Sequence, residues 1–139
     1  MNINITIVFT AMAFLLSSTI GNAQGKPTPE AVVQENLEHY NKRDIEGFMR
    51  SFSDSISLHT FGSTQAPTVG LSAIRALYEN LFEESPQLHS TIKHRILLGN
   101  KVIDHEFIVG RRGSDTPIEI VLIYEVAEGK ISKMTVIRD

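Results

Sequence analysis

Two histidines, His94 and His105, are the residues of this sequence best suited to proton transfer, because the unperturbed pKa of an imidazole lies near 6.5. They lie in two runs of alternating apolar residues, 91–98 and 101–109, on either side of the dipeptide Gly99-Asn100. Such dipeptides close two-residue β-hairpin turns. Counting outward from the turn places His94 directly opposite His105, so the spacing predicts a hairpin that brings the two rings together.

Successive side chains of a strand point to opposite faces, so the hairpin residues fall into two sets. The charged set places Arg95 opposite Asp104 and Lys93 opposite Glu106, which indicates ion pairs on the surface or at a dimer interface. The other set is mostly apolar and includes both histidines. We expect this second set to face the interior; besides the histidines it contains Ile92, Ile96, Leu98, Ile103, Phe107 and Val109.

Two histidines that share an inward face could act as general acid and general base on a bound molecule. They could instead be half-buried residues bonded to backbone or water. A metal site would need a third ligand for zinc, and none is indicated. Tyr124 is expected on the same face of a later strand as Leu122 and Val126, where its hydroxyl would orient a ligand or the side chain would simply belong to the core.

The chain of 139 residues has the length of one domain, and its formal charge of −3 argues against a nucleic-acid partner, which would require a basic surface. It contains no cysteine, which excludes disulfides, thiol catalysis and thiolate metal ligation. The region of Gly62 and Gly70 lacks the glycine spacing and the lysine of a phosphate-binding loop. No cofactor is therefore expected.

The first residues resemble a secretory signal. An almost unbroken apolar run, 5–20, precedes the small-residue sequence Gly21-Asn22-Ala23, although no Lys or Arg comes before it. The run is short for a transmembrane helix. We expect a signal peptide over 1–23, a linker over 24–28 and an exported mature protein, periplasmic or secreted, with no membrane attachment after cleavage. An uncleaved anchor or a buried helix is the alternative.

Helical and strand periodicities follow one another along the rest of the chain. Thr28-Pro29 predicts a helix start, Asp44 predicts the start of a short second helix, and Ser72 is the expected cap of a third helix that ends at Ser85-Pro86. A strand with alternating residues is expected over 55–60, and Glu128-Gly129 closes a last hairpin that places Val126 opposite Ile131 and Tyr124 opposite Lys133. The order predicts an α+β fold in which about three helices cover the concave face of a curved antiparallel sheet.

Three stretches of the sequence resemble the SnoaL-like families of the nuclear-transport-factor-like, or cystatin-like α+β cone, superfamily. They are residues 32–52, Ala73-Ile74-Arg75-Ala76-Leu77-Tyr78, and Ile123-Tyr124-Glu125-Val126 with Glu128-Gly129-Lys130-Ile131. The resemblance covers nearly all of the expected domain, 29–139. It implies an apolar cavity between the helices and the concave sheet face, a small apolar organic ligand, and a homodimer formed through the outer sheet face.

Ketosteroid isomerases belong to the same superfamily, and the resemblance places Thr60 at the position of their general base. It places Asn36 and Leu122 at their oxyanion-hole positions. A threonine does not transfer protons near neutral pH and a leucine cannot donate a hydrogen bond, so ketosteroid isomerisation by that machinery is not expected. The comparison also suggests a cavity wall that includes, besides these three residues, Tyr40, Phe52, Tyr78 and Phe107.

The sequence thus predicts an exported SnoaL-like domain that binds a small apolar organic molecule. If it is an enzyme, we expect proton-transfer chemistry of the isomerase, cyclase or hydratase type, with His94, His105 and Tyr124 as catalytic residues. The alternative is a non-enzymatic binding or scaffold domain whose cone is filled by its own side chains.

Overall fold

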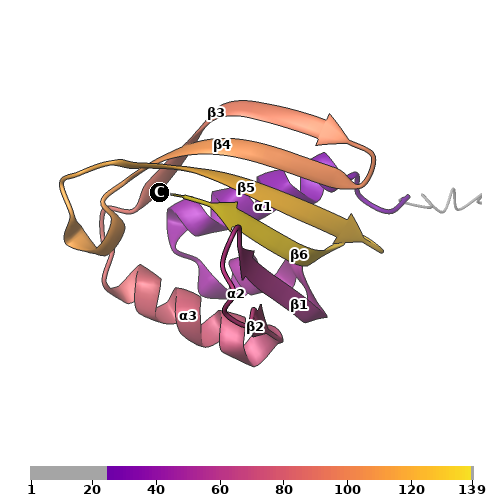
Figure 1. Cartoon of the computed structure of the whole chain (residues 1–139), viewed down its shortest axis with the longest axis horizontal. Helices are drawn as coiled ribbons and strands as arrows, with labels where there is room; N and C mark the ends of the chain where they lie inside the picture. The colour runs from indigo at the N-terminus through magenta and orange to yellow at the C-terminus, as the bar shows by residue number, and fades with distance from the viewer. Residues whose placement is uncertain (1–24, 139) are drawn as a thin grey trace, which may run out of the picture.

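The computed structural model describes residues 25–138 as three helices and a six-stranded sheet with the strand order β2-β1-β6-β5-β4-β3 (Figure 1). The helices are α1 (Pro29–Lys42), α2 (Ile45–Arg50) and α3 (Leu71–Glu83), with a 3₁₀ turn, η1 (Arg111–Gly113). The strands are β1 (Phe52–Thr60), β2 (Thr68–Val69), β3 (His89–Leu98), β4 (Lys101–Val109), β5 (Ile118–Ala127) and β6 (Lys130–Ile137). The predicted α+β fold is confirmed.

Two details of the sheet differ from the prediction. β1 runs parallel to β6, so the curved sheet is mixed rather than wholly antiparallel. The loop expected over 62–70 contains the short strand β2, which pairs with β1. The predicted signal peptide lies outside the described residues and stays a prediction. Within residues 25–138, none of the helices is long and apolar enough to cross a membrane.

The helix starts follow from the capping residues. The Thr28 hydroxyl accepts a hydrogen bond from the backbone N–H of Ala31 (3.2 Å), and the Asp44 carboxylate accepts one from that of Gly47 (3.0 Å). The cap predicted at Ser72 is wrong, because α3 begins at Leu71 and Ser72 already lies within the helix. Its N-cap is Gly70, whose φ of 90° lies in a region that glycine enters without strain.

The register of the β3–β4 hairpin is as predicted from the turn up to the pair His94–His105. Beyond it, Lys93 forms a β-bulge, so that Ile92 rather than Lys93 lies opposite Glu106. The predicted Lys93–Glu106 pair is therefore wrong. The Lys93 ammonium group donates instead to a carboxylate oxygen of Glu119 at 2.9 Å.

The predicted facing of the hairpin is also wrong. The buried residues of β4 are Val102, Asp104, Glu106 and Ile108, and the residues between them are only half-buried. The two acids therefore point toward the helices and both histidines lie on the outer face. The physical reason is that the outer face is apolar too: a row of aligned residues crosses it, formed by Ile96, Ile103, Ile123 and Thr135.

In the last hairpin, Val126 lies opposite Ile131 as predicted, but an irregularity then shifts the register by one residue. Tyr124 therefore pairs with Met134 instead of Lys133. Both side chains of this pair are buried on the concave face. The predicted inward orientation of Tyr124 thus agrees with the structure.

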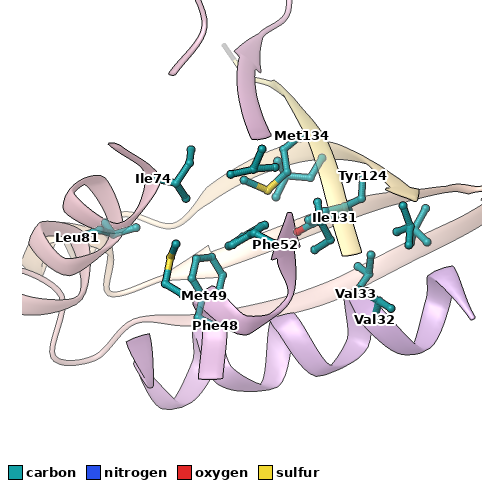
Figure 2. Close-up of a cluster of buried hydrophobic side chains, with 14 of the residues drawn as sticks. Val32, Val33, Phe48, Met49, Phe52, Ile74, Leu81, Tyr124, Ile131 and Met134 are labelled. Carbon is teal, nitrogen blue, oxygen red and sulfur yellow. The ribbon is translucent and has the colours of Figure 1, made fainter. Parts of the chain in front are cut away.

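The hydrophobic core lies between the three helices and the concave face of the sheet (Figure 2). Phe48 and Phe52 pack edge to face with ring centroids 5.0 Å apart, and Met134 and Tyr124 approach from the sheet. Phe48 also belongs to an aromatic cluster with Tyr40, Tyr78 and Phe82. This cluster continues the core into the wall of a cavity.

Strands β1, β4 and β6 run in the same direction and end at the same edge of the sheet, where the segment that follows β4 also lies (Figure 1). That segment begins at Gly110, which has a φ of +67°, and a Cβ atom there would lie 2.2 Å from the carbonyl oxygen of Gln87. The backbone N–H of Arg112 donates to the fully buried hydroxyl of Ser85 at 2.8 Å. The segment after β4 is therefore held against the end of α3.

Candidate functional site

A cavity of about 560 Å³ lies between the helices and the concave face of the sheet. Of the residues predicted for its wall, the structure places there Asn36, Tyr40, Thr60, Tyr78, Leu122 and Tyr124. The other two lie elsewhere. Phe52 is buried in the core, and Phe107 lies on the outer face with the Lys93 ammonium 5.6 Å from its ring centroid.

The predicted histidine pair does form, but outside this cavity. The rings of His94 and His105 stack with centroids 5.9 Å apart, and His105 Nε2 lies 2.7 Å from a carboxylate oxygen of Glu119. Glu119 is exposed, and the hydrogen bonds from Lys93 and His105 lower the pKa of its carboxyl group. The histidines therefore belong to a polar cluster on the outer face and do not line this cavity.

The acidic residue in the wall of the cavity is Glu106, whose side chain is buried. The Ser90 hydroxyl donates to Oε2 at 2.7 Å, and the Tyr124 hydroxyl donates to Oε1 at 3.2 Å. Burial raises the pKa of Glu106 to about 7, although both hydrogen bonds oppose the shift. The sequence interpretation had placed this residue on the surface, so Glu106 is the functional candidate that it missed.

Asn41 of α1 holds Ser90, the residue that donates a hydrogen bond to Glu106, in position. The Asn41 side chain, near the end of α1, donates to the Ser90 carbonyl at 2.9 Å and accepts from its N–H at 2.7 Å. The amide thus satisfies both backbone groups of an edge-strand residue, as a neighbouring strand would do. Ser90, and through it the Glu106 carboxyl group, is thereby fixed relative to α1.

Asp104 lies two residues from Glu106 on the same face of β4 and is 1% exposed. Arg95 holds it with two hydrogen bonds, Nε to Oδ1 and Nη2 to Oδ2, each of 2.7 Å. This parallel geometry is the strongest form of an Arg–carboxylate pair. The pairing predicted between Arg95 and Asp104 is thus confirmed, but it lies under α1, where Arg95 also donates to Gln34 at 3.0 Å.

Three tyrosines line the cavity, and burial raises the pKa of Tyr40, Tyr78 and Tyr124 above the ordinary value. All three therefore remain neutral hydrogen-bond donors at physiological pH. Tyr124 donates to Glu106, whereas the hydroxyl groups of Tyr40 and Tyr78 have no hydrogen-bond partner between residues 25 and 138. Those two donors are available to a molecule in the cavity.

This arrangement is suited to general acid–base chemistry, because a carboxyl group with a pKa of about 7 both accepts and releases a proton near neutral pH. A signal for Glu106 was present in the sequence, since Asp104 and Glu106 alternate with a histidine on one strand. The surface position predicted for it is wrong because the facing of the hairpin is reversed, and the bulge at Lys93, which removes the expected cation from Glu106, leaves no mark in the pattern of residue types.

Solved structures similar to this chain share its fold. A nuclear-transport-factor-2-like protein of unknown function from Cytophaga hutchinsonii superposes with a TM-score of 0.69 at 15% identity, covering 84% of this chain and 94% of that one. A cystatin-fold protein from Novosphingobium aromaticivorans superposes with a TM-score of 0.72 at 20% identity, covering 81% of this chain and 99% of that one. A candidate SnoaL-like polyketide cyclase from Jannaschia sp. superposes with a TM-score of 0.69 at 14% identity, covering 80% of this chain and 85% of that one.

The comparison with curated protein sequences gave no match. The family model of the SnoaL-like domain, by contrast, matches residues 33–134, a range that extends from α1 into β6 and includes Glu106, its hydrogen-bond partners and the Arg95–Asp104 pair. With the fold and the cavity described above, this match means that the chain belongs to the SnoaL-like domain family.

Proposed function

We propose that the cavity binds a small, mostly apolar organic molecule and that Glu106 exchanges a proton with it. The observation that carries the proposal is a buried carboxyl group with a pKa of about 7 in the wall of a cavity of about 560 Å³. Aromatic and aliphatic side chains form much of that wall, and a few polar groups converge on it, as in small-molecule sites generally.

The chemistry that fits is an isomerisation or cyclisation that passes through an enolate. The Glu106 carboxylate would take a proton from a carbon atom next to a carbonyl group of the ligand. A neutral tyrosine hydroxyl, from Tyr40 or Tyr78, would donate a hydrogen bond to the oxygen on which negative charge develops. The protonated Glu106 would then return the proton to another atom of the same molecule, so that protons and electrons balance without a cofactor.

A carbon acid of suitable size tests this role. We expect the protein to accelerate exchange of the C1 protons of 2-tetralone in deuterated buffer, followed by NMR. We expect Glu106→Gln to reduce the acceleration about 100-fold, because a carboxamide cannot act as the base. Glu119→Gln is the matched control, since that carboxylate lies on the outer face, and should leave the exchange rate unchanged.

Two results would count against this role. Equal exchange rates for the wild type and Glu106→Gln would exclude Glu106 as the base. Binding of 2-tetralone without any acceleration would favour the non-enzymatic binding domain instead. The second alternative from the sequence, a cone filled by its own side chains, is not favoured, because the cavity is open between the helices and the sheet.

We also propose that the protein forms a homodimer through the outer face of the sheet. The support is the half-buried apolar row of Ile103 and Ile123, continued by the more exposed Ile96 at the edge. We expect light scattering to give the mass of a dimer and Ile123→Lys to give that of a monomer, because a charge in an apolar interface would have to be desolvated. A monomeric wild type would refute the proposal.

A further inference from the structure

Three arginines lie in the wall of the cavity at one end. Arg111 follows β4, Arg138 follows β6, and these two strands end at the same edge of the sheet (Figure 1). Arg112 is the third. Among the described residues that form the wall, Glu106 is the sole acid. This end of the cavity therefore carries a concentrated positive charge in a chain whose overall formal charge is −3.

The three guanidinium groups differ in how they are neutralised. Arg112 pairs with Glu84 and donates to the side-chain oxygen of Asn80 at 3.2 Å. In the part of the chain from 25 to 138, neither Arg111 nor Arg138 has a carboxylate oxygen within 4.0 Å. Arg111 is half-buried, so the lack of an anion is more costly for it than for a fully solvated group.

The positive charge of Arg111 acts on the interior of the cavity. It lowers the pKa of Tyr40 and of Tyr78, in opposition to the larger effect of burial, so the guanidinium lies within electrostatic range of both hydroxyl groups. Those are the two hydroxyl groups that lack a hydrogen-bond partner in residues 25–138. One basic group and two neutral donors thus belong to the wall of the same cavity, within electrostatic range of one another.

The turn that presents Arg111 is held rigidly. Gly110 packs against the backbone of Gln87, and Ser85 binds the N–H of Arg112. Arg112 itself has a φ of 51°, a left-handed conformation that is strained for a residue with a side chain. Such strain persists only where surrounding contacts enforce it. The guanidinium group of Arg111 is therefore carried on a preorganised support.

We propose that the molecule bound in this cavity is an apolar organic acid whose carboxylate group binds Arg111, assisted by Arg138, at this end. The inference deepens the function proposed above and depends on it. Arginine suits this role because its planar guanidinium group binds a carboxylate with two parallel hydrogen bonds. The apolar body of the acid would lie along the aromatic wall and extend toward Glu106.

The dimensions of the site agree with a single molecule that reaches both groups. Arg111 follows Glu106 by five residues along β4 and the turn after it, so their Cα atoms are at most about 17 Å apart at the rise of an extended chain. Both side chains project into the cavity and shorten that span. A molecule with one or two rings, or a chain of medium length, fills it.

Matched acids and alcohols test the inference. Binding of naphthalene-2-acetate and octanoate is compared with that of naphthalene-2-ethanol and 1-octanol by calorimetry of the wild-type protein at pH 8 and low salt. We expect each acid to bind about tenfold more tightly than its alcohol. Arg111→Gln should remove most of this preference while leaving the affinity for the alcohols within about twofold.

Arg75→Gln is the matched control, because it removes one arginine charge that lies outside the wall of the cavity and pairs with Glu46. This control should leave the preference for the acids intact. Arg138→Gln is a second test variant, for the case in which Arg111→Gln does not fold, and it should reduce the preference for the acids. Equal binding of acids and alcohols would overturn the inference but leave the proposed proton transfer standing. Failure of all four probes to bind would overturn it as well, and exchange of 2-tetralone would then decide separately whether the cavity works as proposed.

Discussion

The Arg95→Met variant is expected to lose about 3–5 kcal/mol of its free energy of unfolding, because it leaves the carboxylate of Asp104 buried without a cation. Asp104 is 1% exposed and both of its carboxylate oxygens accept from Arg95 at 2.7 Å. Methionine retains much of the aliphatic volume of arginine, so the loss would reflect the charge rather than a cavity. Urea denaturation at pH 7 measures it.

Two further variants show whether the buried pair is the cause. Arg75→Met removes an arginine from the exposed pairs with Glu46 and Glu79, and it should leave the urea midpoint almost unchanged. The double variant Arg95→Met with Asp104→Leu should recover most of the lost stability, because it removes both charges together. If Arg95→Met were no less stable than Arg75→Met, the pair would not be buried as the structure shows.

The second large effect is a dependence of stability on pH that originates at Glu106. Its pKa is about 7 in the folded protein and has the ordinary value of 4.5 when the chain unfolds. Between these values the folded state retains a proton that the unfolded state releases, so the free energy of unfolding falls as the pH rises. The difference between the two pKa values corresponds to about 3 kcal/mol of the free energy of unfolding. This contribution is fully present below pH 4.5 and is lost above pH 7.

Denaturation curves measured from pH 4 to 8 for the wild type and for Glu106→Gln isolate this contribution, because the other titrating groups, including the five histidines, are common to both proteins. The difference between the two free energies should change by about 3 kcal/mol across the window, with the wild type losing stability relative to the variant as the pH rises. A constant difference would show that the Glu106 carboxyl group is not desolvated.

Features governed by neighbouring residues could be predicted from the sequence. The Thr28 and Asp44 caps, the turn at Gly99-Asn100 and the pairing of His94 with His105 all depend on contacts close along the chain, and the structure confirms each of them. The alternation of a strand also predicts that Tyr124 shares a face with Leu122 and Val126, and all three side chains are buried in the structure.

The facing of the β3–β4 hairpin depends instead on how β4 pairs with β5, through the connection 110–117. Neither the length nor the composition of that connection fixes whether odd or even residues of β4 share a face with Tyr124. Both faces of the sheet carry apolar residues, so the pattern of hydrophobicity does not identify which face is the inner one. Counting outward from the turn therefore predicts the histidines in the cavity and Glu106 on the surface, paired with Lys93, and both predictions are wrong.

The bulge at Lys93 also affects how sequences of this kind should be compared. The bulge reverses which residues of β3 point inward. Between the turn and the bulge Arg95 faces the helices, whereas beyond the bulge Ile92 and Ser90 face them. If Lys93 were paired in a regular strand instead of forming the bulge, it would lie opposite Glu106, Ser90 would turn outward, and the carboxyl group of Glu106 would have one donor fewer. An ungapped alignment of this chain with one whose hairpin lacks the bulge would therefore match residues of opposite orientation on the far side of Lys93.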